Sequence, residues 1–458
     1  MTDVDVAVVG GGMAGLATAY ELQRRGASFV LIEAAPRPGG GGRPERVDGV
    51  PLDAGPDSLL VQKPAALELC RELGLEDRLL STLEPRIAYV LRGRLRPIPE
   101  ASVLGIPTAV APWVSSRLLS PAGRLRLAAD LVLPRGDGAD ESVGSFFRRR
   151  FGREAVEYIA EPLLAGIHAG DVDQLSMPAL FPRLAEAERA CGSVIRALRQ
   201  LRRAAPRRLG GLFRSLPGGI AELAAALTAA LPAAAVRCGT RAVALGGPSP
   251  YMVRLSAGGS VSARCVILAP PAHVTATLVR PLDDRLAALC GEIPYTSTAT
   301  VLLAYPRSAV RRQPRGSGFV VPRRERAVPL MAGSWVTSKW PGRAPDGQVL
   351  LRGFLGGVRD PRVDQRSDDE LIDRTHGAFA GLLGIGRRPH LARVYRWERA
   401  NPQHNVGHLA RIAAIEARLD CCPGLFVTGA GFRGVGIPDC VADGRATARQ
   451  AMDWRTAG

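Results

Sequence analysis

Three glycines near the start of the chain have the spacing of a phosphate-binding turn. Gly10, Gly12 and Gly15 follow the apolar run Val4-Asp5-Val6-Ala7-Val8-Val9 and open a helix-like stretch. In the G-x-G-x-x-G pattern the first glycine permits a tight turn, the second lets a pyrophosphate approach the backbone, and the third lets helix and strand pack closely. The pyrophosphate then meets free N–H groups at a helix N-terminus, where the helix dipole favours negative charge. The pattern therefore predicts a dinucleotide site.

An acid stands at the end of the next apolar run. Glu33 lies eighteen residues after Gly15 and directly follows Phe29-Val30-Leu31-Ile32. This spacing is close to the ~20 residues after which an acid accepts hydrogen bonds from a ribose hydroxyl. A free 2′-hydroxyl is therefore expected, which disfavours NADP. Strand, turn, helix, strand and acid arrive in the order of one βαβ unit, which a chance glycine-rich loop does not show.

Composition and charge bound the class of protein. With 458 residues, of which 46% are hydrophobic and 22% charged, the chain is long enough for two or three globular domains. The net charge of +17 comes almost wholly from arginine, and Ala, Gly and Pro are abundant too, as is typical of a GC-rich genome. A positive surface favours anionic ligands or membrane surfaces. No recognition motif or aromatic platform accompanies the charge, so nucleic acid is not expected as a partner.

Targeting signals and cysteine patterns add little. Asp3 and Asp5 stand where a secretory signal would be basic, and the longest apolar stretch, 223–236, is shorter than the ~18 residues of a membrane span. We therefore expect a cytoplasmic protein with no transmembrane segment, and peripheral contact with the cytoplasmic membrane stays open. The eight cysteines show no C-x-x-C or other metal-ligand spacing, so packed, reduced thiols and no metal site are expected.

Apolar periodicity and turn residues predict further elements along the chain. Helices are expected at 63–80, 142–150, 154–166, 368–383 and from 437 to about 452, strands at 236–245, 262–270, 298–304, 348–355 and from 425 into a glycine turn, and a hairpin at 86–97. A helix is also expected after Pro217, but no predicted strand precedes it. The chain therefore offers no second strand-glycine-helix unit for a nicotinamide cofactor.

The glycine-dense loops after Glu33 extend the pattern beyond one βαβ unit. Pro38-Gly39-Gly40-Gly41 and then Gly55-Pro56-Asp57-Ser58 follow the acid in order. Loops of this kind make tight turns or let a backbone lie against a ligand. Their order resembles the flavoprotein fold that amine oxidases, phytoene desaturases and protoporphyrinogen oxidases share. The resemblance implies one bound FAD and no pyridine nucleotide.

The stretch 161–171 carries the most specific resemblance. It reads Glu161-Pro162-Leu163-Leu164-Ala165-Gly166-Ile167-His168-Ala169-Gly170-Asp171 and is similar to the signature E-P-L-L-[SA]-G-I-Y-A-G-D of porphyrinogen oxidases. Amine oxidases and carotenoid desaturases lack this signature. Further matches to the porphyrinogen oxidases, in order and spacing, are Lys63 after the 55–58 run, Trp397, Pro402-Gln403, Val406-Gly407-His408 and the segment 433–440. The chain thus resembles this family almost end to end.

The resemblance implies an α/β plus α+β fold with three parts. They are an FAD-binding Rossmann-like domain of the amine oxidase and porphyrinogen oxidase type (1–80, 206–280 and 391–458), a substrate domain on a mixed sheet (81–97 and 281–390), and a helical insertion (98–205). The helix that opens at Ile437 is expected to point its N–H groups at the flavin, as helix starts do toward electron-rich partners.

The family pattern also implies site residues. Candidate cofactor contacts, including those of the βαβ unit, are Gly10, Gly11, Gly12, Met13, Ala14, Gly15, Glu33, Ala34, Gly41, Gly55, Pro56, Asp57, Ser58, Val243, Trp397, Ile437, Pro438 and Asp439. Candidate substrate contacts are Lys63, Gly166, Ile167 and His168. No side chain is assigned a catalytic role, because the flavin carries the chemistry.

Five positions depart from the family pattern. Gly41 replaces Lys or Arg, Pro44 replaces Thr or Ser, His168 replaces Tyr, and Asn401 and His404 replace Met and Tyr. None of these changes removes a group that flavin oxidation requires, but they leave the shape of the pocket near 168 and 404 open. For the histidines, packing or hydrogen bonding is as good an interpretation as proton transfer.

The resemblance implies an oxygen-dependent porphyrinogen oxidase of haem biosynthesis. Six hydrogens leave the porphyrinogen, and dioxygen is the simplest final acceptor because no nicotinamide site is predicted, with hydrogen peroxide as co-product. The basic, GC-rich chain resembles the Gram-positive branch of the family, which favours coproporphyrinogen III over protoporphyrinogen IX as substrate. A transient contact with the next haem-pathway enzyme stays open. So do two remoter alternatives, an amine or carotenoid oxidase of this fold and a non-catalytic escort-type binding protein.

Lys63 is expected to hold a propionate of the substrate. It stands eight residues after Gly55, where the family has a pocket lysine, and is one of two lysines among 60 basic residues. A compact ammonium suits a site in which a planar guanidinium would not fit. The plainer alternative is a lysine left on a solvated helix face.

Overall fold

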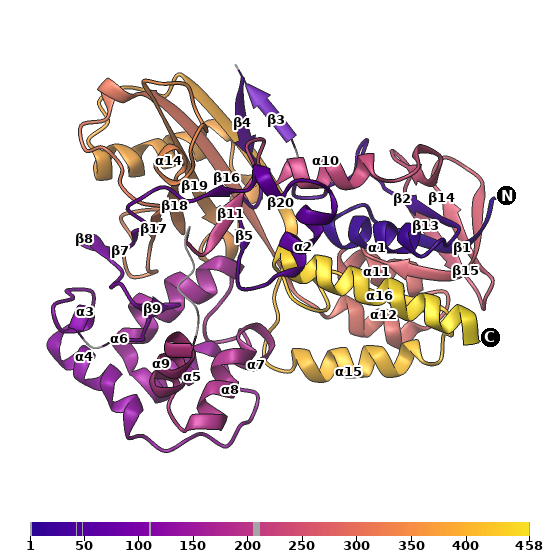
Figure 1. The fold of residues 1–458 in the computed structure, drawn as a ribbon, viewed down its shortest axis with the longest axis horizontal. Helices are drawn as coiled ribbons and strands as arrows, with labels where there is room; N and C mark the ends of the chain where they lie inside the picture. Colours follow the sequence, from indigo (N-terminus) through magenta and orange to yellow (C-terminus); the bar gives the residue numbers. More distant parts are fainter. Residues whose placement is uncertain (1, 43, 48, 110, 205–210, 458) are drawn as a thin grey trace. The chain divides into compact units, whose positions relative to one another are not determined.

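The chain forms two compact units, each built from segments that are discontinuous in sequence (Figure 1). The computed structural model describes residues 2–42, 44–47, 49–109, 111–204 and 211–457. The first unit comprises Met1–Leu80, Leu212–Pro294 and Leu409–Gly458, and the second comprises Ser81–Gly211 and Tyr295–His408.

A largely parallel sheet forms the centre of the first unit, in the order β12-β2-β1-β15-β14-β13 with β21 beside β15. Its strands are β1 (Thr2–Val9), β2 (Phe29–Ile32), β12 (Val236–Arg237), β13 (Ala242–Gly246), β14 (Tyr251–Leu255), β15 (Ser260–Leu268) and β21 (Leu425–Val427). The pairs of β1 with β2 and β15, of β12 with β2 and of β21 with β15 are parallel, whereas β13 and β14 are antiparallel. The apolar run before the glycine turn is thus a central strand, and Val6, Ala7 and Val8 are fully buried.

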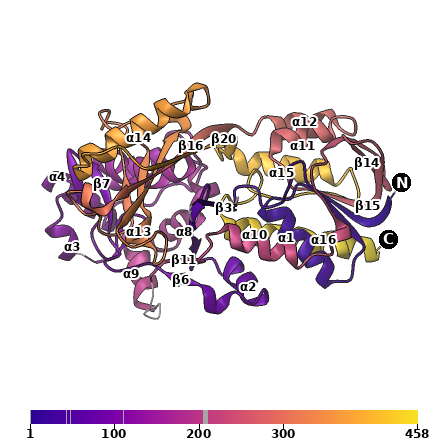
Figure 2. The same cartoon turned by 90° about the horizontal axis from the view of Figure 1, so that it is seen from above.

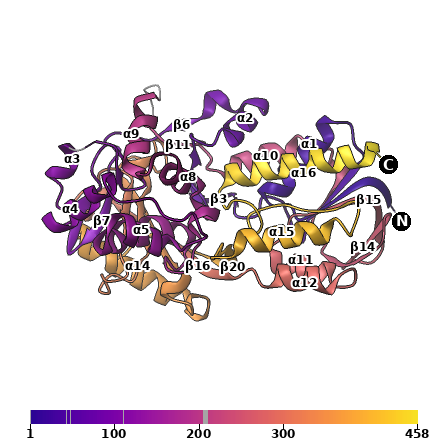
Figure 3. The ribbon, with the colours of Figure 1, turned by 90° about the horizontal axis from the view of Figure 1, so that it is seen from below.

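Helices cover both faces of this sheet. Figures 2 and 3 show α1 (Met13–Arg24), α10 (Ala221–Ala229) and α16 (Ile437–Ala457) on one face and α11 (Ala272–Val279) and α12 (Asp284–Gly291) on the other. The remaining helices of the unit are α2 (Ala65–Glu72), α15 (His408–Leu419), which begins at the unit boundary, and the 3-10 turns η1 (Glu76–Arg78) and η5 (Ala233–Ala235). A Cβ on Gly444 would lie 2.3 Å from the carbonyl oxygen of Ala14, so only glycine allows α16 to approach α1 this closely.

Short strands complete the first unit. The hairpin of β3 (Pro44–Val47) and β4 (Val50–Asp53) follows the glycine-dense loop, and β5 (Leu59–Leu60) pairs with β11 (Phe213–Ser215). The two-residue strand β6 (Leu80–Ser81) lies at the unit boundary.

The second unit is built on a mixed seven-stranded sheet, in the order β20-β16-β19-β18-β17-β7-β8. Its strands are β7 (Ala88–Arg92), β8 (Arg94–Pro97), β16 (Tyr295–Pro306), β17 (Gly318–Val320), β18 (Ala332–Trp335), β19 (Gln348–Gly356) and β20 (Leu391–Pro402). The helix α14 (Asp368–Leu383) packs its buried Leu371, Phe379 and Leu383 on this sheet. The Ser367 hydroxyl accepts the N–H of Glu370 at its start, and Gly384 ends it in a left-handed conformation.

The helical part of the second unit has its own apolar core, which includes Phe146, Phe147 and Phe151. Its elements are β9 (Ser102–Val103), β10 (Ile106–Pro107), α3 (Ala111–Val114), α4 (Pro121–Ala128), η2 (Ala129–Leu131), α5 (Val143–Phe151), α6 (Arg153–Ala155), the π-helix η3 (Val156–Ala165), η4 (Gly166–His168), α7 (Met177–Leu180), α8 (Pro182–Cys191) and α9 (Val194–Ala204). The short turns η6 (Arg307–Ala309), α13 (Val336–Lys339), η7 (Gly357–Arg359) and η8 (Val363–Gln365) connect the strands of the sheet.

Several elements differ from those expected. The helix expected at 63–80 is only α2, because Gly74 ends it in a left-handed conformation. The helix expected at 154–166 becomes a π-helix around Pro162, which has no N–H to donate. The strand expected at 236–245 is split into β12 and β13, and β14 forms an unexpected middle strand of the meander. The helix after Pro217 does follow a strand, β11, which is too short to show a pattern in the sequence.

Two boundary segments lie in the opposite unit from the expected one. Residues 281–294, expected with the substrate domain, belong to the first unit because α11 and α12 pack against each other. Residues 391–408, expected with the cofactor domain, belong to the second unit because β20 pairs antiparallel with β16.

The eight cysteines are free, and four of them, Cys70, Cys265, Cys290 and Cys440, are buried. Burial raises the pKa of Cys70 to about 11 and that of Cys290 to about 12, so both remain protonated, unreactive thiols at neutral pH. Over the part of the chain that the structure describes, no helix combines the length and apolarity needed to cross a membrane.

Candidate functional site

The glycine turn joins β1 to α1 through close backbone contacts. Gly10 adopts a φ of 98°, and its N–H donates to the carbonyl oxygen of Ile32 at 2.8 Å. A Cβ on Gly15 would lie 1.8 Å from the carbonyl oxygen of Gly10, so the first turn of α1 packs directly on the strand end. Gly10 and Gly15 thus meet the expectations of tight turning and close packing.

Gly12 differs from these two glycines, because a Cβ placed on it would meet nothing within 4 Å. It is the N-cap of α1, and no side chain caps this helix start and no acid occupies its first turn, which begins with Met13 and Ala14. The open space above Gly12 and the positive end of the helix dipole suit a pyrophosphate. The residues present therefore fit a dinucleotide at this turn.

Glu33 lies directly behind the turn. Its Oε2 accepts the N–H of Gly11 at 2.5 Å, and its Oε1 accepts the N–H of Ala35 at 2.7 Å, past the exposed Ala34. The carboxylate therefore holds the turn and the strand end together. Its remaining acceptor positions suit the expected ribose contact.

The two glycine-dense loops contact each other beside the turn. A Cβ on Gly40 would lie 3.2 Å from Cα of Gly12, and one on Gly55 would lie 2.4 Å from the carbonyl oxygen of Gly41. A Cβ on Gly41 would meet Cδ of Pro56 at 3.6 Å, an ordinary van der Waals contact. Gly12, Gly41, Gly55 and Pro56 thus form one continuous backbone surface, although 43 residues separate the first from the third.

The residues that follow this surface are anchored in the unit. Asp57 is buried, its Oδ1 accepts the hydroxyl of Ser58 at 2.9 Å, and its carbonyl oxygen accepts the hydroxyl of Ser215 at 2.8 Å. Ser215 is the last residue of β11, the strand that the sequence did not predict. The β5–β11 pair therefore keeps the 55–58 run in place.

The start of α16 binds one of the predicted substrate residues. The helix opens with Ile437, the buried Pro438 and Asp439, whose carboxylate accepts the N–H of Gly436 at 3.2 Å. The Lys63 ammonium donates to the same oxygen, Oδ2, at 2.6 Å. Lys63 and Asp439, 376 residues apart, therefore form an ion pair.

One residue of the same region was missed from the sequence. Asp443, one turn further along α16, accepts the Thr428 hydroxyl at 2.6 Å and the N–H of Gly429 at 2.8 Å, and Arg433 pairs with its second oxygen at 3.3 Å. It therefore fixes the glycine turn after β21 to α16. A single aspartate inside a helix has no signature that would reveal this role.

The segment 161–171, which we call the signature loop, lies in the second unit. It leaves the π-helix η3, passes through η4 and reverses at Ala169, which has a φ of 53°. Ile167 is 67% exposed at the tip, whereas Ala169 and Gly170 are buried. The His168 ring lies edge-on to Phe181 with ring centroids 5.8 Å apart. The loop thus presents an apolar side chain and an imidazole on a buried backbone support.

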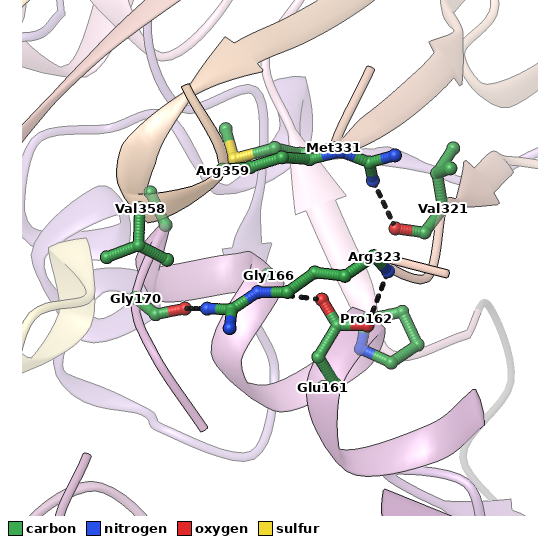
Figure 4. Close-up of a pocket in the computed structure, with 10 residues that line it drawn as sticks. Glu161, Pro162, Gly166, Gly170, Val321, Arg323, Met331, Val358 and Arg359 are labelled. Carbon is green, nitrogen blue, oxygen red and sulfur yellow. Dashed lines mark hydrogen bonds and ion pairs between the residues drawn. The ribbon is translucent and has the colours of Figure 1, made fainter. Parts of the chain in front are cut away.

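A small pocket lies against this loop (Figure 4). Glu161, Pro162, Gly166, Ala169, Gly170, Val321, Arg323, Met331, Val358 and Arg359 line it. Burial raises the pKa of Glu161, although the N–H and the charge of Arg323 act in the opposite direction. Burial also lowers the pKa of Arg359. Of the predicted site residues, only Gly166 is part of this lining.

Two further predicted cofactor residues, Val243 and Trp397, lie on strands outside the segments described so far. Val243 lies on β13, at a register shift in its pairing with β14, and is about half exposed. Trp397 lies on β20 opposite Thr298 of β16, in the sheet of the second unit. The structure therefore places Trp397 in a different unit from the glycine turn.

Two of the departures from the family pattern, Asn401 and His404, lie close together in the second unit. His404 and His408 are buried and stack with ring centroids 3.8 Å apart, and Asn401 donates to Thr298 Oγ1 at 3.1 Å. Gln403 donates to the carbonyl oxygen of His168 at 2.9 Å. The structure thus connects the 401–408 segment to the signature loop.

A family model described as flavin containing amine oxidoreductase matches residues 13–452 of the chain. A coproporphyrinogen III oxidase of Bacillus subtilis (strain 168) is 35% identical over 98% of both chains. A protein of the same name from Staphylococcus aureus is 32% identical over 98% of both chains.

Solved structures agree on the fold. A crystal structure from Exiguobacterium sp. 255-15, provisionally assigned as a protoporphyrinogen oxidase, matches with a TM-score of 0.85 and 29% identity over 99% of both chains. A double mutant of putrescine oxidase matches with a TM-score of 0.71 and 17% identity over 99% of both chains, which concerns the fold alone.

Proposed function

The chain belongs to the flavin-containing amine oxidoreductase family, and from this premise we propose that it is an FAD-dependent oxidase that converts coproporphyrinogen III to coproporphyrin III in haem biosynthesis. The near full-length similarity to curated relatives named coproporphyrinogen III oxidase carries the proposal. The porphyrinogen oxidase signature at 161–171 supports it independently, because oxidases of amines lack that stretch.

FAD is the form of flavin that the first unit fits. The uncapped start of α1 and the open space above Gly12 suit a pyrophosphate, and the acid Glu33 suits an adenosine ribose. A mononucleotide would need neither. The proposed contacts are the glycine turn with Met13 and Ala14, Glu33 and Ala34, and the backbone surface of Gly41, Gly55 and Pro56 with Asp57 and Ser58. The start of α16, Val243 and Trp397 complete the proposed set.

The substrate contacts that we propose are Lys63 and the tip of the signature loop. The Lys63 ammonium would take a propionate in place of, or together with, the carboxylate of Asp439, since both are anionic acceptors of the same donor. Ile167 and His168 at the tip of the signature loop would contact the macrocycle, and Gly166 would leave room beside them. The macrocycle would bury the exposed Ile167 side chain, and burial of this apolar surface favours binding.

The protein's part in the chemistry is binding and orientation. When bound, the flavin supplies the two-electron acceptor, with dioxygen as the proposed final oxidant. The backbone surface around Gly12 holds the cofactor without a bulky side chain in the way. The signature loop and Lys63 orient the macrocycle by its apolar face and its propionates. None of these contacts requires a covalent bond to the substrate.

The decisive experiment compares coproporphyrinogen III and protoporphyrinogen IX side by side with the purified holoprotein. We expect the higher kcat/KM for coproporphyrinogen III, oxygen consumption, and one hydrogen peroxide for each pair of hydrogens removed. A higher kcat/KM for protoporphyrinogen IX would reassign the substrate. Anaerobic turnover with NAD⁺ as sole acceptor would refute the oxidase, and a protein purified without flavin would point to a binding function.

A further inference from the structure

The two ends of the signature loop meet on a single arginine. The backbone N–H of Arg323 donates to Oε2 of Glu161 at 2.8 Å, and its Nε lies 3.6 Å from Oε1. On the other side of the guanidinium, Nη1 donates to Oδ1 of Asp171 at 3.4 Å and Nη2 to the carbonyl oxygen of Gly170 at 3.3 Å. Arg323 therefore joins the first residue of the loop to its last two, as Figure 4 shows for Glu161 and Gly170.

Arg323 is itself held in place by a second arginine. It lies in the turn that follows β17, and the N–H of Val321 donates to Met331 across the base of this turn at 2.9 Å. The guanidinium of Arg359 donates to the carbonyl oxygens of Val321, Glu325 and Val328 at 2.9, 3.1 and 2.9 Å. The backbone that carries Arg323 is thus braced from inside the unit.

The middle of the loop is held by its backbone. The carbonyl oxygen of Ala169 accepts the N–H of Val358 at 3.1 Å, and that of His168 accepts Nε2 of Gln403 at 2.9 Å. A Cβ on Gly357 would lie 2.5 Å from the Ala169 carbonyl oxygen, so η7 presses directly on the loop. These contacts leave the side chain of Ile167 exposed at the tip.

We propose that Arg323 is a positioning residue that closes the signature loop and sets where Ile167 and His168 meet the substrate. This inference rests on the proposed function for the identity of the substrate. A planar guanidinium suits the task because its two Nη atoms donate to Asp171 and Gly170 while its Nε faces Glu161, whereas a lysine ammonium is a point charge. The hydrogen bond to Glu161 comes from the backbone of Arg323 and is kept in every variant at this position. The raised pKa of Glu161 agrees with a carboxyl that the loop has drawn out of solvent.

The neighbouring arginine provides a matched control. Arg324 is exposed, pairs with Glu157 one turn before Glu161 at 2.5 Å, and lies over the Tyr158 ring. It therefore contacts the same helix without reaching the loop ends. Arg324→Gln and Arg323→Gln each remove one positive charge. We expect only Arg323→Gln to open the loop.

The experiment compares Arg323→Gln, Arg323→Lys and Arg324→Gln with the wild-type holoprotein. It measures flavin content, thermal unfolding, KM and kcat for coproporphyrinogen III, and hydrogen–deuterium exchange of the 166–170 amides. For Arg323→Gln we expect faster exchange at 166–170 and a KM raised about tenfold, with flavin content kept. Arg323→Lys should fall between this variant and wild type, and Arg324→Gln should match wild type.

The outcomes separate the loop contact from the proposed function. Unchanged exchange and unchanged KM in Arg323→Gln would overturn the proposal, as would equal changes in Arg324→Gln. If Arg323→Gln does not fold, faster exchange at 166–170 in folded Arg323→Lys supports the proposal and wild-type exchange overturns it. If the wild type oxidises no porphyrinogen while exchange changes as expected, the proposed function fails and the closure of the loop stands.

Discussion

Each of the two candidate sites is stabilised by a different kind of contact within it. In the first unit, glycines let backbone approach backbone, as where a Cβ on Gly15 would lie 1.8 Å from Gly10 and one on Gly55 would lie 2.4 Å from Gly41. In the second unit, the charged side chain of Arg323 joins the ends of the signature loop, whereas backbone contacts hold its middle. A cofactor site of the proposed kind requires a backbone surface free of bulky side chains. A loop that contacts substrate requires side chains from neighbouring segments to fix its position.

The difference predicts how each region responds to substitution. A backbone contact tolerates no added atom, so a single methyl group disrupts it. A side-chain contact can be weakened in steps, because a shorter or neutral side chain keeps part of the geometry. The four expectations below test this contrast, from the largest effect to the smallest.

We expect Gly15→Val to prevent the first unit from folding, and Gly12→Val to leave it folded but without bound flavin. The valine at 15 would collide with the Gly10 carbonyl oxygen, while the valine at 12 would extend into open space that the pyrophosphate needs. We expect Gly15→Val to be insoluble or unfolded and Gly12→Val to fold as a colourless apoprotein. Flavin absorbance and circular dichroism distinguish the two, and full flavin content in Gly12→Val would contradict the site.

Asp130→Asn should destabilise the helical part of the second unit by ~3–5 kcal/mol, because it removes the fully buried counter-charge of Arg150 and leaves this guanidinium only the carboxylate of Glu188 at 3.4 Å. Asp130 and Arg150 are both fully buried, with Arg150 Nε donating to Oδ1 at 2.6 Å. Ser193 and the N–H of Ile195 also donate to Asp130. Urea unfolding measures the loss. The exposed Asp137→Asn serves as control, and a similar loss there would show that the buried pair contributes little.

Two carboxylates, one in each unit, should give opposite pH dependences. Burial alone would raise the pKa of Glu21, but hydrogen bonds from Arg25 and Arg445 and the charges of Arg445 and Arg449 lower it below the usual 4.5. Burial raises the pKa of Glu161 above 4.5. The ionised Glu21 therefore stabilises the fold above pH 4.5, and this is lost as pH falls through its folded-state pKa. Ionised Glu161 is penalised, so its contribution declines as pH rises above 4.5.

Unfolding of Glu21→Gln and Glu161→Gln against wild type, from pH 3 to 8, tests these signs. At pH 7 we expect Glu21→Gln to cost ~1.5–3 kcal/mol, and the difference to shrink below pH 4.5. The stability of Glu161→Gln relative to wild type should instead increase with pH. Parallel pH profiles for the two variants would refute the contrast.

Lys63→Ala should have the smallest effect on stability, ~0–1 kcal/mol, because its ion pair with Asp439 is partly exposed. If Lys63 binds a propionate, KM for coproporphyrinogen III rises about tenfold while flavin content stays constant. Asp439→Asn provides the matched variant, since it frees the ammonium and should lower KM. An unchanged KM for Lys63→Ala would show that Lys63 does not bind substrate and only forms the ion pair with Asp439.

The sequence by itself determined the features that depend on neighbours along the chain. The stretch from Gly10 to Gly15 leads from the end of β1 into the first turn of α1, as its spacing indicates. The helix at 368–383 has the expected bounds because Ser367 caps its start and Gly384 ends it. Such features are readable because a turn or cap is decided by residues a few positions apart.

Only the tertiary structure decided which distant residues meet. Lys63 and Asp439 were each expected in a site, but their ion pair spans 376 positions. Arg323 contacts Glu161 and Asp171 across more than 150 positions, and nothing in the sequence around Arg323 distinguishes it from the other arginines. Such contacts arise because sheet pairing and burial bring the segments together, and the partner of a charged side chain is then set by geometry rather than by local pattern.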